Sequence, residues 1–218
     1  MTKKLIWDLP TRIFHWLLAL LICGSWYTVT ITGDMDTHML IGQTILVLVL
    51  FRIVWGFIGS RYARFASFAY GPGEIVAYSR SLAGRGSAGY AGHNPLGGAV
   101  VFLMLALVLA QASTGLFATD GDFYSGPLNN LISSRAANQV TEFHEVNFNV
   151  ILAVVVVHVA AAFFYLLFKR ENLIAAMITG RKNDPNGTLE PIQGSKLFSA
   201  GIALLIVAAC VYALVTYL

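Results

Sequence analysis

The sequence predicts an all-α integral membrane protein, with a four-helix transmembrane bundle followed by a fifth transmembrane helix at the C-terminus. Composition is the first reason: of 218 residues, 57% are apolar and only 11% are charged, whereas a soluble domain carries about 25% charge. The second reason is the presence of five apolar stretches, each long enough to cross a bilayer core of about 30 Å as a helix. These observations exclude a soluble enzyme, a disordered chain and a collagen-like chain.

The five predicted spans are residues 13–32, 39–58, 96–118, 146–168 and 197–218. Helices are expected because a chain in lipid must satisfy its own backbone polar groups. The first span follows Lys3 and Lys4, as a signal peptide would, but it is too long for a signal-peptide core and lacks a small-residue cleavage pattern. We therefore expect it to remain in the protein as a membrane span.

The basic residues indicate how the spans are oriented. By the positive-inside rule, the side of the membrane that carries most Lys and Arg is cytoplasmic. The N-terminus is therefore expected in the cytoplasm and the C-terminus outside. All basic residues except Arg135 fall on the predicted cytoplasmic side: Lys3, Lys4, Arg12, Arg52, Arg61, Arg64, Arg80, Arg85, Lys169, Arg170, Arg181, Lys182 and Lys196.

The opposite side is acidic. Such a surface favours a basic soluble partner, although carboxylates that only cap helices and solvate turns are the alternative. The chain as a whole is nearly balanced, with 14 basic against 11 acidic residues, so no nucleic-acid partner is expected. The acidic residues of the outer side are Asp34, Asp36, Asp120, Asp122, Glu142 and Glu145.

Two connections between the spans carry signals of their own. Residues 59–94 mix aromatic residues with arginines, as a segment at the membrane interface does, and a short amphipathic helix is predicted after Pro72. Pro95 then falls in the first turn of the third span, where proline is tolerated. The outer connection, residues 119–141, is rich in Asn, Ser and Gly and predicts a short surface structure.

Four histidines lie in or beside the predicted spans, where ionisable residues are costly and indicate function. His144 and His158 share the fourth span, and the helix between them separates their rings by about 40° in rotation and about 21 Å in rise. His38 opens the second span at the outer surface, and His15 lies near the cytoplasmic start of the first. Depth therefore pairs His38 with His144 outside, and His15 with His158 inside.

Two imidazoles at one depth, from different helices, are what a bis-histidine haem requires. Gly42, one turn from His38, and the alanines at 160–162 leave room for a flat macrocycle, although close helix packing explains small residues equally well. A metal transporter or proton pump would favour ligands or acids near the midplane, and no acid lies in the centre of a predicted span. Because the two cysteines form no CxxCH motif, covalent haem attachment is excluded. Two stacked non-covalent haems are the favoured interpretation.

Haem propionates are anionic and favour Arg. Arg52, at the cytoplasmic end of the second span, is the first candidate, with a snorkelling flank residue as the alternative. Arg12, Arg61 and Lys169 are also within range of the inner haem, whereas the outer haem has only Arg135.

His93 lies outside the spans, on the predicted cytoplasmic side and next to Asn94. We interpret it as an interfacial residue or part of a helix cap. Contact with a quinone or a haem propionate is the alternative.

Five segments resemble the bacterial cytochrome b561 family, which includes the b-type cytochrome subunits of membrane-bound nickel-iron hydrogenases. The resemblance runs from Trp7 to about Lys182. The segments are WDLPTRIFHW from Trp7, HMLIGQ from His38, FRIVWGFIGSRYARF from Phe51, GHNPLGG from Gly92 and ENLIAAMITGRK from Glu171.

The resemblance implies a four-helix core holding two b-type haems, ligated from the first, second and fourth helices. The matching positions are His15, His38, His144 and His158. It divides the chain into a dihaem cytochrome b membrane domain at residues 1–182 and a cytoplasmic linker with the fifth helix at 183–218, to which it assigns no role. It also implies a multi-pass protein of the bacterial inner (cytoplasmic) membrane.

The function implied is electron exchange between membrane quinone and a periplasmic redox partner, either a c-type cytochrome or a reductase. Quinone is then a further bound cofactor, quinol or quinone oxidoreductase activity would follow, and no catalytic residue stands out. The alternative is a cytochrome b anchor subunit of a membrane-bound hydrogenase or dehydrogenase. A superoxide:quinone oxidoreductase, known in the family, and a non-haem transporter are less favoured, because nothing marks an oxidant site and the histidines lie at two depths.

Overall fold

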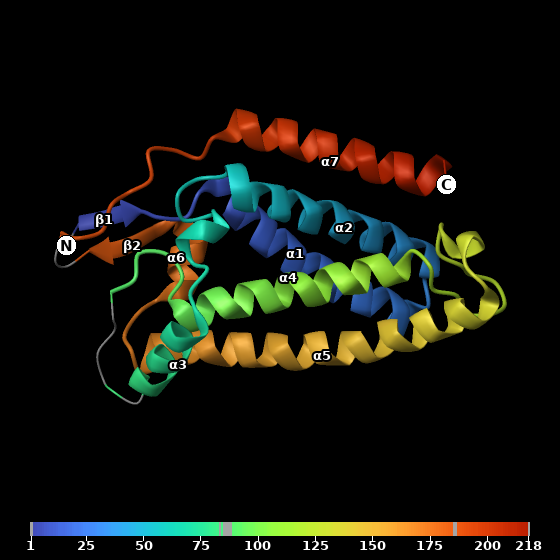
Figure 1. Cartoon of the computed structure of the whole chain (residues 1–218), viewed down its shortest axis with the longest axis horizontal. Helices are drawn as coiled ribbons and strands as arrows, with labels where there is room; N and C mark the ends of the chain where they lie inside the picture. The colour runs from blue at the N-terminus through green and yellow to red at the C-terminus, as the bar shows by residue number, and fades with distance from the viewer. Residues whose placement is uncertain (1, 83, 85–88, 185–186, 218) are drawn as a thin grey trace. The chain divides into compact units, whose positions relative to one another are not determined.

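The computed structural model describes residues 2–82, 84, 89–184 and 187–217, and five of its helices have the length and composition to cross a membrane (Figure 1). The predicted all-α membrane fold with five spans is therefore confirmed. Arg85 and Leu218, which were part of the predicted charge pattern and of the last span, lie outside the described residues. The five helices are α1 (Leu9–Tyr27, continued by a π-helical turn at Thr28–Thr32), α2 (Met35–Ile58), α4 (Pro95–Gly115), α5 (Ser134–Leu167) and α7 (Leu197–Tyr217).

Four helices begin earlier than their predicted spans: α1 at Leu9, α2 at Met35, α4 at Pro95 and α5 at Ser134. α5 begins at Ser134 rather than at residue 146, so residues 134–141 of the outer connection are helical. Its first turns are polar, and a hydropathy criterion finds only the apolar part of a helix. α2 begins at Met35 because Asp34 caps it: the Asp34 carboxylate accepts the Thr37 backbone N–H at 3.0 Å.

The shorter elements agree in part with the sequence analysis. The helix predicted after Pro72 is present as α3 (Pro72–Ser81), and Asn94 caps α4 by accepting the Gly97 N–H at 2.7 Å. The outer connection contains an isolated bridge between Thr119 and Ser125 and a 3₁₀ turn. The remaining elements, which the sequence analysis did not predict, are the 3₁₀ turn Phe65–Ser67, α6 (Leu173–Thr179), and an antiparallel pair of strands, β1 (Thr2–Leu5) and β2 (Arg181–Asp184).

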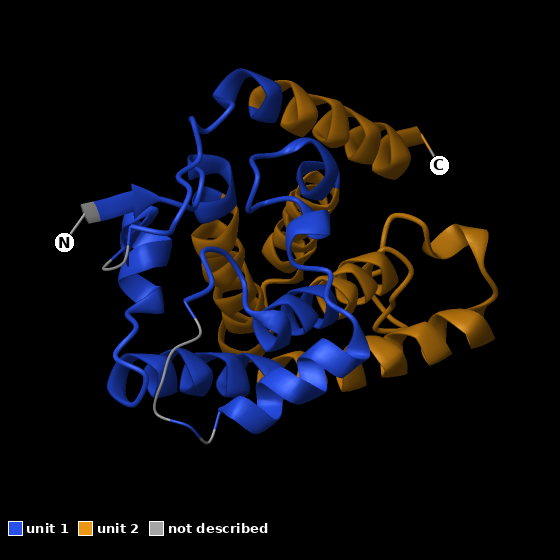
Figure 2. Cartoon of the chain, turned by 60° about the vertical axis from the view of Figure 1, so that its left-hand side comes forward, with its two compact units in different colours: residues 1–13, 54–104, 154–200 blue, residues 14–53, 105–153, 201–218 orange. Residues whose placement is uncertain are grey.

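Residues group by contact into two compact units (Figure 2). Unit 1 comprises residues 1–13, 54–104 and 154–200, and unit 2 comprises residues 14–53, 105–153 and 201–218. The expected division at residues 182 and 183 follows the family resemblance instead, and it stays a prediction.

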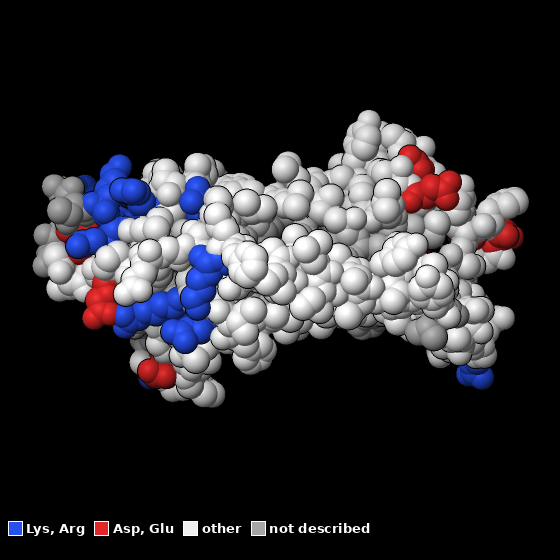
Figure 3. All heavy atoms as spheres, turned by 90° about the horizontal axis from the view of Figure 1, so that it is seen from above, with Lys and Arg blue, Asp and Glu red and all other residues white. Residues whose placement is uncertain are grey.

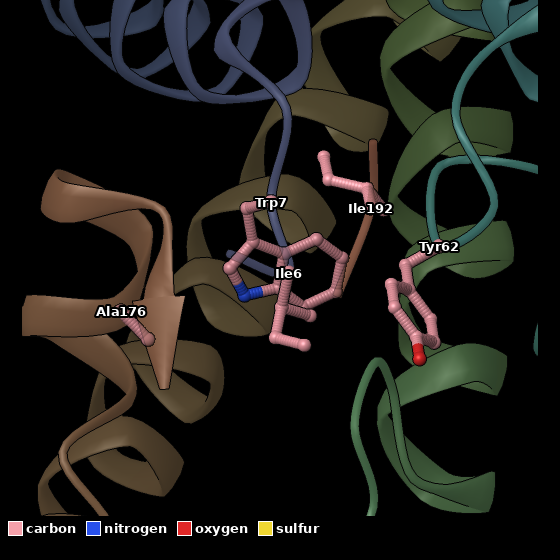
Figure 4. Close-up of a cluster of buried hydrophobic side chains, with 5 residues drawn as sticks. All are labelled: Ile6, Trp7, Tyr62, Ala176 and Ile192. Carbon is pink, nitrogen blue, oxygen red and sulfur yellow. The ribbon is translucent and has the colours of Figure 1, made fainter. Parts of the chain in front are cut away.

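The core of unit 1 joins segments that are far apart in sequence (Figure 4). Ile6 and Trp7 follow β1, Tyr62 follows α2, Ala176 lies on α6, and Ile192 lies in the linker before α7. The backbone N–H of Ile192 donates to the carbonyl of Leu5 at 2.9 Å. The linker to the fifth helix is therefore packed against the N-terminal segment.

A buried carboxylate organises the start of α1 in unit 1. Asp8 is only 1% exposed. It accepts hydrogen bonds from the Thr11 backbone N–H at 2.7 Å, from the Trp55 indole N–H at 3.2 Å and from the Ser60 hydroxyl. Buried charges need such donors, and this one both caps α1 and fixes the segment that ends α2.

The two units differ in charge; Figure 3 marks the basic and acidic side chains visible on one face. Unit 2 contains two basic residues, Arg52 and Arg135, and all the other basic residues of the chain belong to unit 1. Each of the six acidic residues that the sequence analysis assigned to the outer side belongs to unit 2. The charge asymmetry of the sequence is thus also an asymmetry between the units.

Candidate functional site

Unit 2 brings together His38 of α2 and His144 of α5. Their ring centroids are 6.4 Å apart, and the ring planes are inclined at 80°. A metal–imidazole bond is about 2 Å long, so two imidazoles on opposite sides of one metal ion have ring centres about 6 Å apart. The predicted outer pair therefore lies at the separation that axial ligation of one iron requires.

The hydrogen bonds of His38 leave one of its ring nitrogens for a metal. Its Nδ1 lies 3.1 Å from the Ser25 carbonyl oxygen and 3.1 Å from the Ser25 hydroxyl oxygen. A carbonyl can only accept, so Nδ1 carries the hydrogen. The lone pair is then on Nε2, which is the nitrogen that can coordinate.

His144 is held in the same tautomer by a different group. Its Nδ1 lies 3.1 Å from the Thr114 hydroxyl oxygen. The Thr114 hydroxyl hydrogen is directed at backbone carbonyls, since Oγ1 is 2.8 Å from the Ala110 oxygen and 3.0 Å from the Gln111 oxygen. Thr114 therefore accepts from Nδ1–H of His144 and leaves Nε2 as the metal-binding nitrogen.

The pair lines a cavity of about 450 Å³ that lies within unit 2. Cofactor pockets have volumes of roughly 300–1,000 Å³. Two glycines keep the cavity open. A side chain at Gly42 would meet no atom within 4 Å, and a Cβ at Gly115 would lie 3.2 Å from Cε1 of His144. The residues present thus fit a flat macrocycle held by two imidazoles.

The charges in this cavity match the shortage of cations expected on the outer side. No Lys or Arg is among its lining residues, all of which are described, and its charged residues apart from the histidines are Asp120 and Glu145. Polar side chains such as Thr30, Gln43 and Asn149 also line it. Neutral hydroxyl and amide groups are therefore the donors that this cavity offers to an anionic substituent.

The predicted inner pair falls in two different units. His15 lies on α1 in unit 2, where its ring packs edge-on against Trp16 at 5.0 Å. His158 lies on α5 in unit 1. Their pairing stays a prediction. No group of three or more His, Cys, Asp or Glu side chains able to hold a metal occurs among the described residues.

The basic side chains proposed to contact haem propionates differ in their burial and in the partners that they already have. Arg52 is 3% exposed and lies on α2 in unit 2. Arg12 donates through Nη2 to the Ile178 carbonyl, while its buried Nε has no hydrogen-bond partner among the described residues. Arg61 pairs with Glu190. Lys169 is buried and donates to backbone carbonyls, one of them at 2.8 Å.

His93 has a different environment from the paired histidines. In unit 1 its ring packs against Trp7 at 4.7 Å and against Phe68 at 4.5 Å between ring centroids. The neighbouring Asn94, rather than His93, provides the helix cap. The Asn94 side chain also donates to the hydroxyl of Tyr165 at 3.0 Å.

Two residues of this site were not found from the sequence, Ser25 and Thr114. Both are small polar residues in apolar spans, which is the one signal that could have drawn attention to them. A hydroxyl pair in unit 1 was also missed: Tyr78 and Tyr165 are joined at 2.8 Å. Burial and this hydrogen bond raise the pKa of Tyr78, so it stays protonated at physiological pH.

Five membrane-spanning helices and a pair of facing imidazoles with free coordinating nitrogens define the class of a helical membrane cytochrome. A profile of the prokaryotic cytochrome b561 family matches residues 6–180, and the chain belongs to this family. It is accordingly a multi-pass bacterial membrane protein of the b-type cytochrome class, with a role in electron transfer.

Two curated relatives align with this chain over most of their length. The "probable Ni/Fe-hydrogenase B-type cytochrome subunit" of Rhizobium leguminosarum bv. viciae is 26% identical over 211 residues, covering 81% of this chain and 87% of the relative. The protein of the same name from Bradyrhizobium diazoefficiens is 25% identical over 213 residues, covering 81% and 85%. No solved structure gives a significant match.

Proposed function

We propose that this chain is a dihaem b-type cytochrome that carries electrons across the bacterial inner membrane, between the quinone pool and a periplasmic redox partner. The observation that supports this best is the 6.4 Å separation of His38 and His144, with each Nδ1 engaged by an acceptor. The Nε2 atoms of His38 and His144 would hold the iron, which would supply one-electron transfer rather than binding of oxygen.

The depth of each histidine along its helix assigns it to one of the two haems. His38 and His144 hold the outer haem iron, and His15 and His158 hold the inner one. When bound, each haem supplies reversible one-electron chemistry of its iron. Arg52 and Arg12 contact the propionates of the inner haem, since both side chains carry fork-like donors suited to carboxylates.

The charge of the two units supports an orientation with the N-terminus in the cytoplasm and the C-terminus in the periplasm. Unit 1 carries nearly all basic residues, which are retained on the cytoplasmic side. Unit 2 then faces the periplasm. Its excess of acidic residues suits a basic soluble partner such as a c-type cytochrome or a reductase.

A second candidate is a cytochrome b subunit fixed in a hydrogenase or dehydrogenase complex. The relatives from Rhizobium leguminosarum and Bradyrhizobium diazoefficiens are both named as hydrogenase cytochrome subunits, which favours it. The two candidates share the same haem ligands and differ in whether the periplasmic partner dissociates.

Haem analysis of the purified protein tests the proposal. We expect two non-covalent haem b groups per chain, reduced-minus-oxidised difference bands of a b-type cytochrome, and reduction of both haems by a quinol in vesicles. A preparation without b-type bands, or with one haem per chain at saturation, overturns the dihaem proposal. Purification in mild detergent separates the two candidates, because a fixed subunit retains a stoichiometric hydrogenase or dehydrogenase.

A further inference from the structure

Helix α4 supplies no candidate ligand, yet two consecutive residues of α4 face the His144 ring. Thr114 places its hydroxyl oxygen 3.1 Å from Nδ1. At Gly115 any side chain would lie 3.2 Å from Cε1 of the same ring, closer than an ordinary contact. One residue therefore anchors the imidazole while the next leaves it room.

The two imidazoles of the pair are anchored by different kinds of acceptor. His38 donates to a backbone carbonyl, that of Ser25, which no side-chain substitution removes. His144 donates to a side-chain hydroxyl. The Gln111 backbone also contributes a hydrogen bond to the His144 ring, so Thr114 is the acceptor at His144 that a side-chain substitution can remove.

A buried amide pair holds α4 and α5 together one turn away from this contact. Asn147 is 4% exposed, and its amide donates to the Leu107 carbonyl at 3.0 Å and to the Gln111 side-chain oxygen at 2.7 Å. Hydrogen bonds between apolar helices in a membrane favour one register. The pair therefore keeps Thr114 opposite His144.

We propose that Thr114 is a positioning residue that fixes the tautomer of His144 and sets the reduction potential of the iron that His144 ligates. This rests on the proposed function. An acceptor at Nδ1–H orients the ring and raises the basicity of Nε2. A more basic ligand stabilises the oxidised iron and so lowers its potential. α4 thereby tunes the cofactor without ligating it.

Thr114→Val removes the acceptor and keeps the shape of the side chain. We expect a higher midpoint potential for the haem transition that His144→Ala abolishes, and a loss of haem affinity of roughly ten- to hundredfold, as for other partners of metal ligands. Thr114→Ser keeps the hydroxyl and is expected to restore both properties.

The matched control is Thr44→Val. Thr44 lies on α2, and its hydroxyl also donates to a carbonyl four residues earlier, that of Leu40 at 2.8 Å, with no histidine beside it. The measurement is a spectroscopic redox titration of all variants together with their haem content. Equal potentials and haem contents in Thr114→Val and Thr44→Val overturn this inference while leaving the dihaem proposal intact. Absence of haem from the unmutated protein would instead refute the proposed function.

Discussion

His144 in unit 2 and His93 in unit 1 have different surroundings. In unit 2, His144 faces another imidazole across 6.4 Å and donates its Nδ1–H to a hydroxyl, beside an open cavity. In unit 1, His93 packs against the rings of Trp7 and Phe68. The first environment suits a metal ligand, and the second suits packing at the end of a span.

The difference shows that the neighbours of a histidine side chain, rather than its position in the sequence, distinguish a metal ligand from a packing residue. A ligating imidazole needs a fixed tautomer, a free Nε2 and space in front of it. His38 and His144 have the tautomer and the space. The His93 ring packs against those of Trp7 and Phe68, so its loss should affect packing first.

Filling the cavity of unit 2 is expected to have the largest effect. Gly42→Leu places a side chain in the cavity, where a Cβ at Gly42 would meet nothing within 4 Å, so the macrocycle and the side chain compete for one space. We expect loss of the haem transition that depends on His38 and His144, with unchanged helix content by circular dichroism. Gly201→Leu on α7, also without a neighbour within 4 Å, is the control. Retention of both transitions in Gly42→Leu would contradict the assignment of the cavity.

Removing the buried carboxylate of unit 1 is expected to cost stability rather than haem. Asp8→Ala leaves the donors of Thr11, Trp55 and Ser60 without their acceptor, and we expect a loss of about 2–4 kcal/mol in the free energy of unfolding. Asp34→Ala removes only an exposed helix cap and should cost less than Asp8→Ala. Denaturant unfolding in detergent measures both. Equal losses would show that the Asp8 network contributes no more than a cap.

Replacing His93 is expected to have a smaller effect on the haem transitions than replacing His144. His93→Phe keeps an aromatic ring against Trp7 and Phe68, and we expect both haem transitions to remain, with a stability change below about 1.5 kcal/mol. A redox titration beside that of His144→Ala provides the measurement. Loss of a transition in His93→Phe would mean that unit 1 uses His93 as a ligand or cofactor contact.

The exposed carboxylates of unit 2 predict a small dependence of stability on pH. Hydrogen bonds from Thr37 lower the pKa of Asp34, and those from the backbone of Tyr124 and Asp122 lower the pKa of Asp120. Their contribution is therefore present above a pH of about 4, the usual carboxyl pKa, and is lost as the pH falls through the lowered values. Unfolding at pH 7 and pH 3 should show this loss, reduced in Asp120→Asn. Equal stability at the two pH values would contradict it.

The parts of the fold that depend on composition and period could be predicted from the sequence. The five spans, the helix at Pro72 and the start of α4 at Asn94-Pro95 each have a local signal. The early start of α5 has none in hydropathy, because its first turns are polar. The strands β1 and β2 are four residues long and rich in charge, so no alternation of apolar residues marks them.

The sequence was sufficient to predict that His38 and His144 lie close together, but not which hydroxyl groups lie beside them. Helical spacing and depth were sufficient to propose His38 with His144, and unit 2 places the two rings together. Thr114 and Ser25 became visible only through contacts between one span and the next. A hydroxyl in a span carries no indication of which imidazole it will meet.

Potentiometric titration of single histidine variants tests the central claim most directly. We expect two haem transitions in the unmutated protein, the same one lost in His38→Ala and in His144→Ala, and the other lost in both His15→Ala and His158→Ala. If His38→Ala and His144→Ala remove different transitions, the two imidazoles do not share an iron, and the account of the site is wrong.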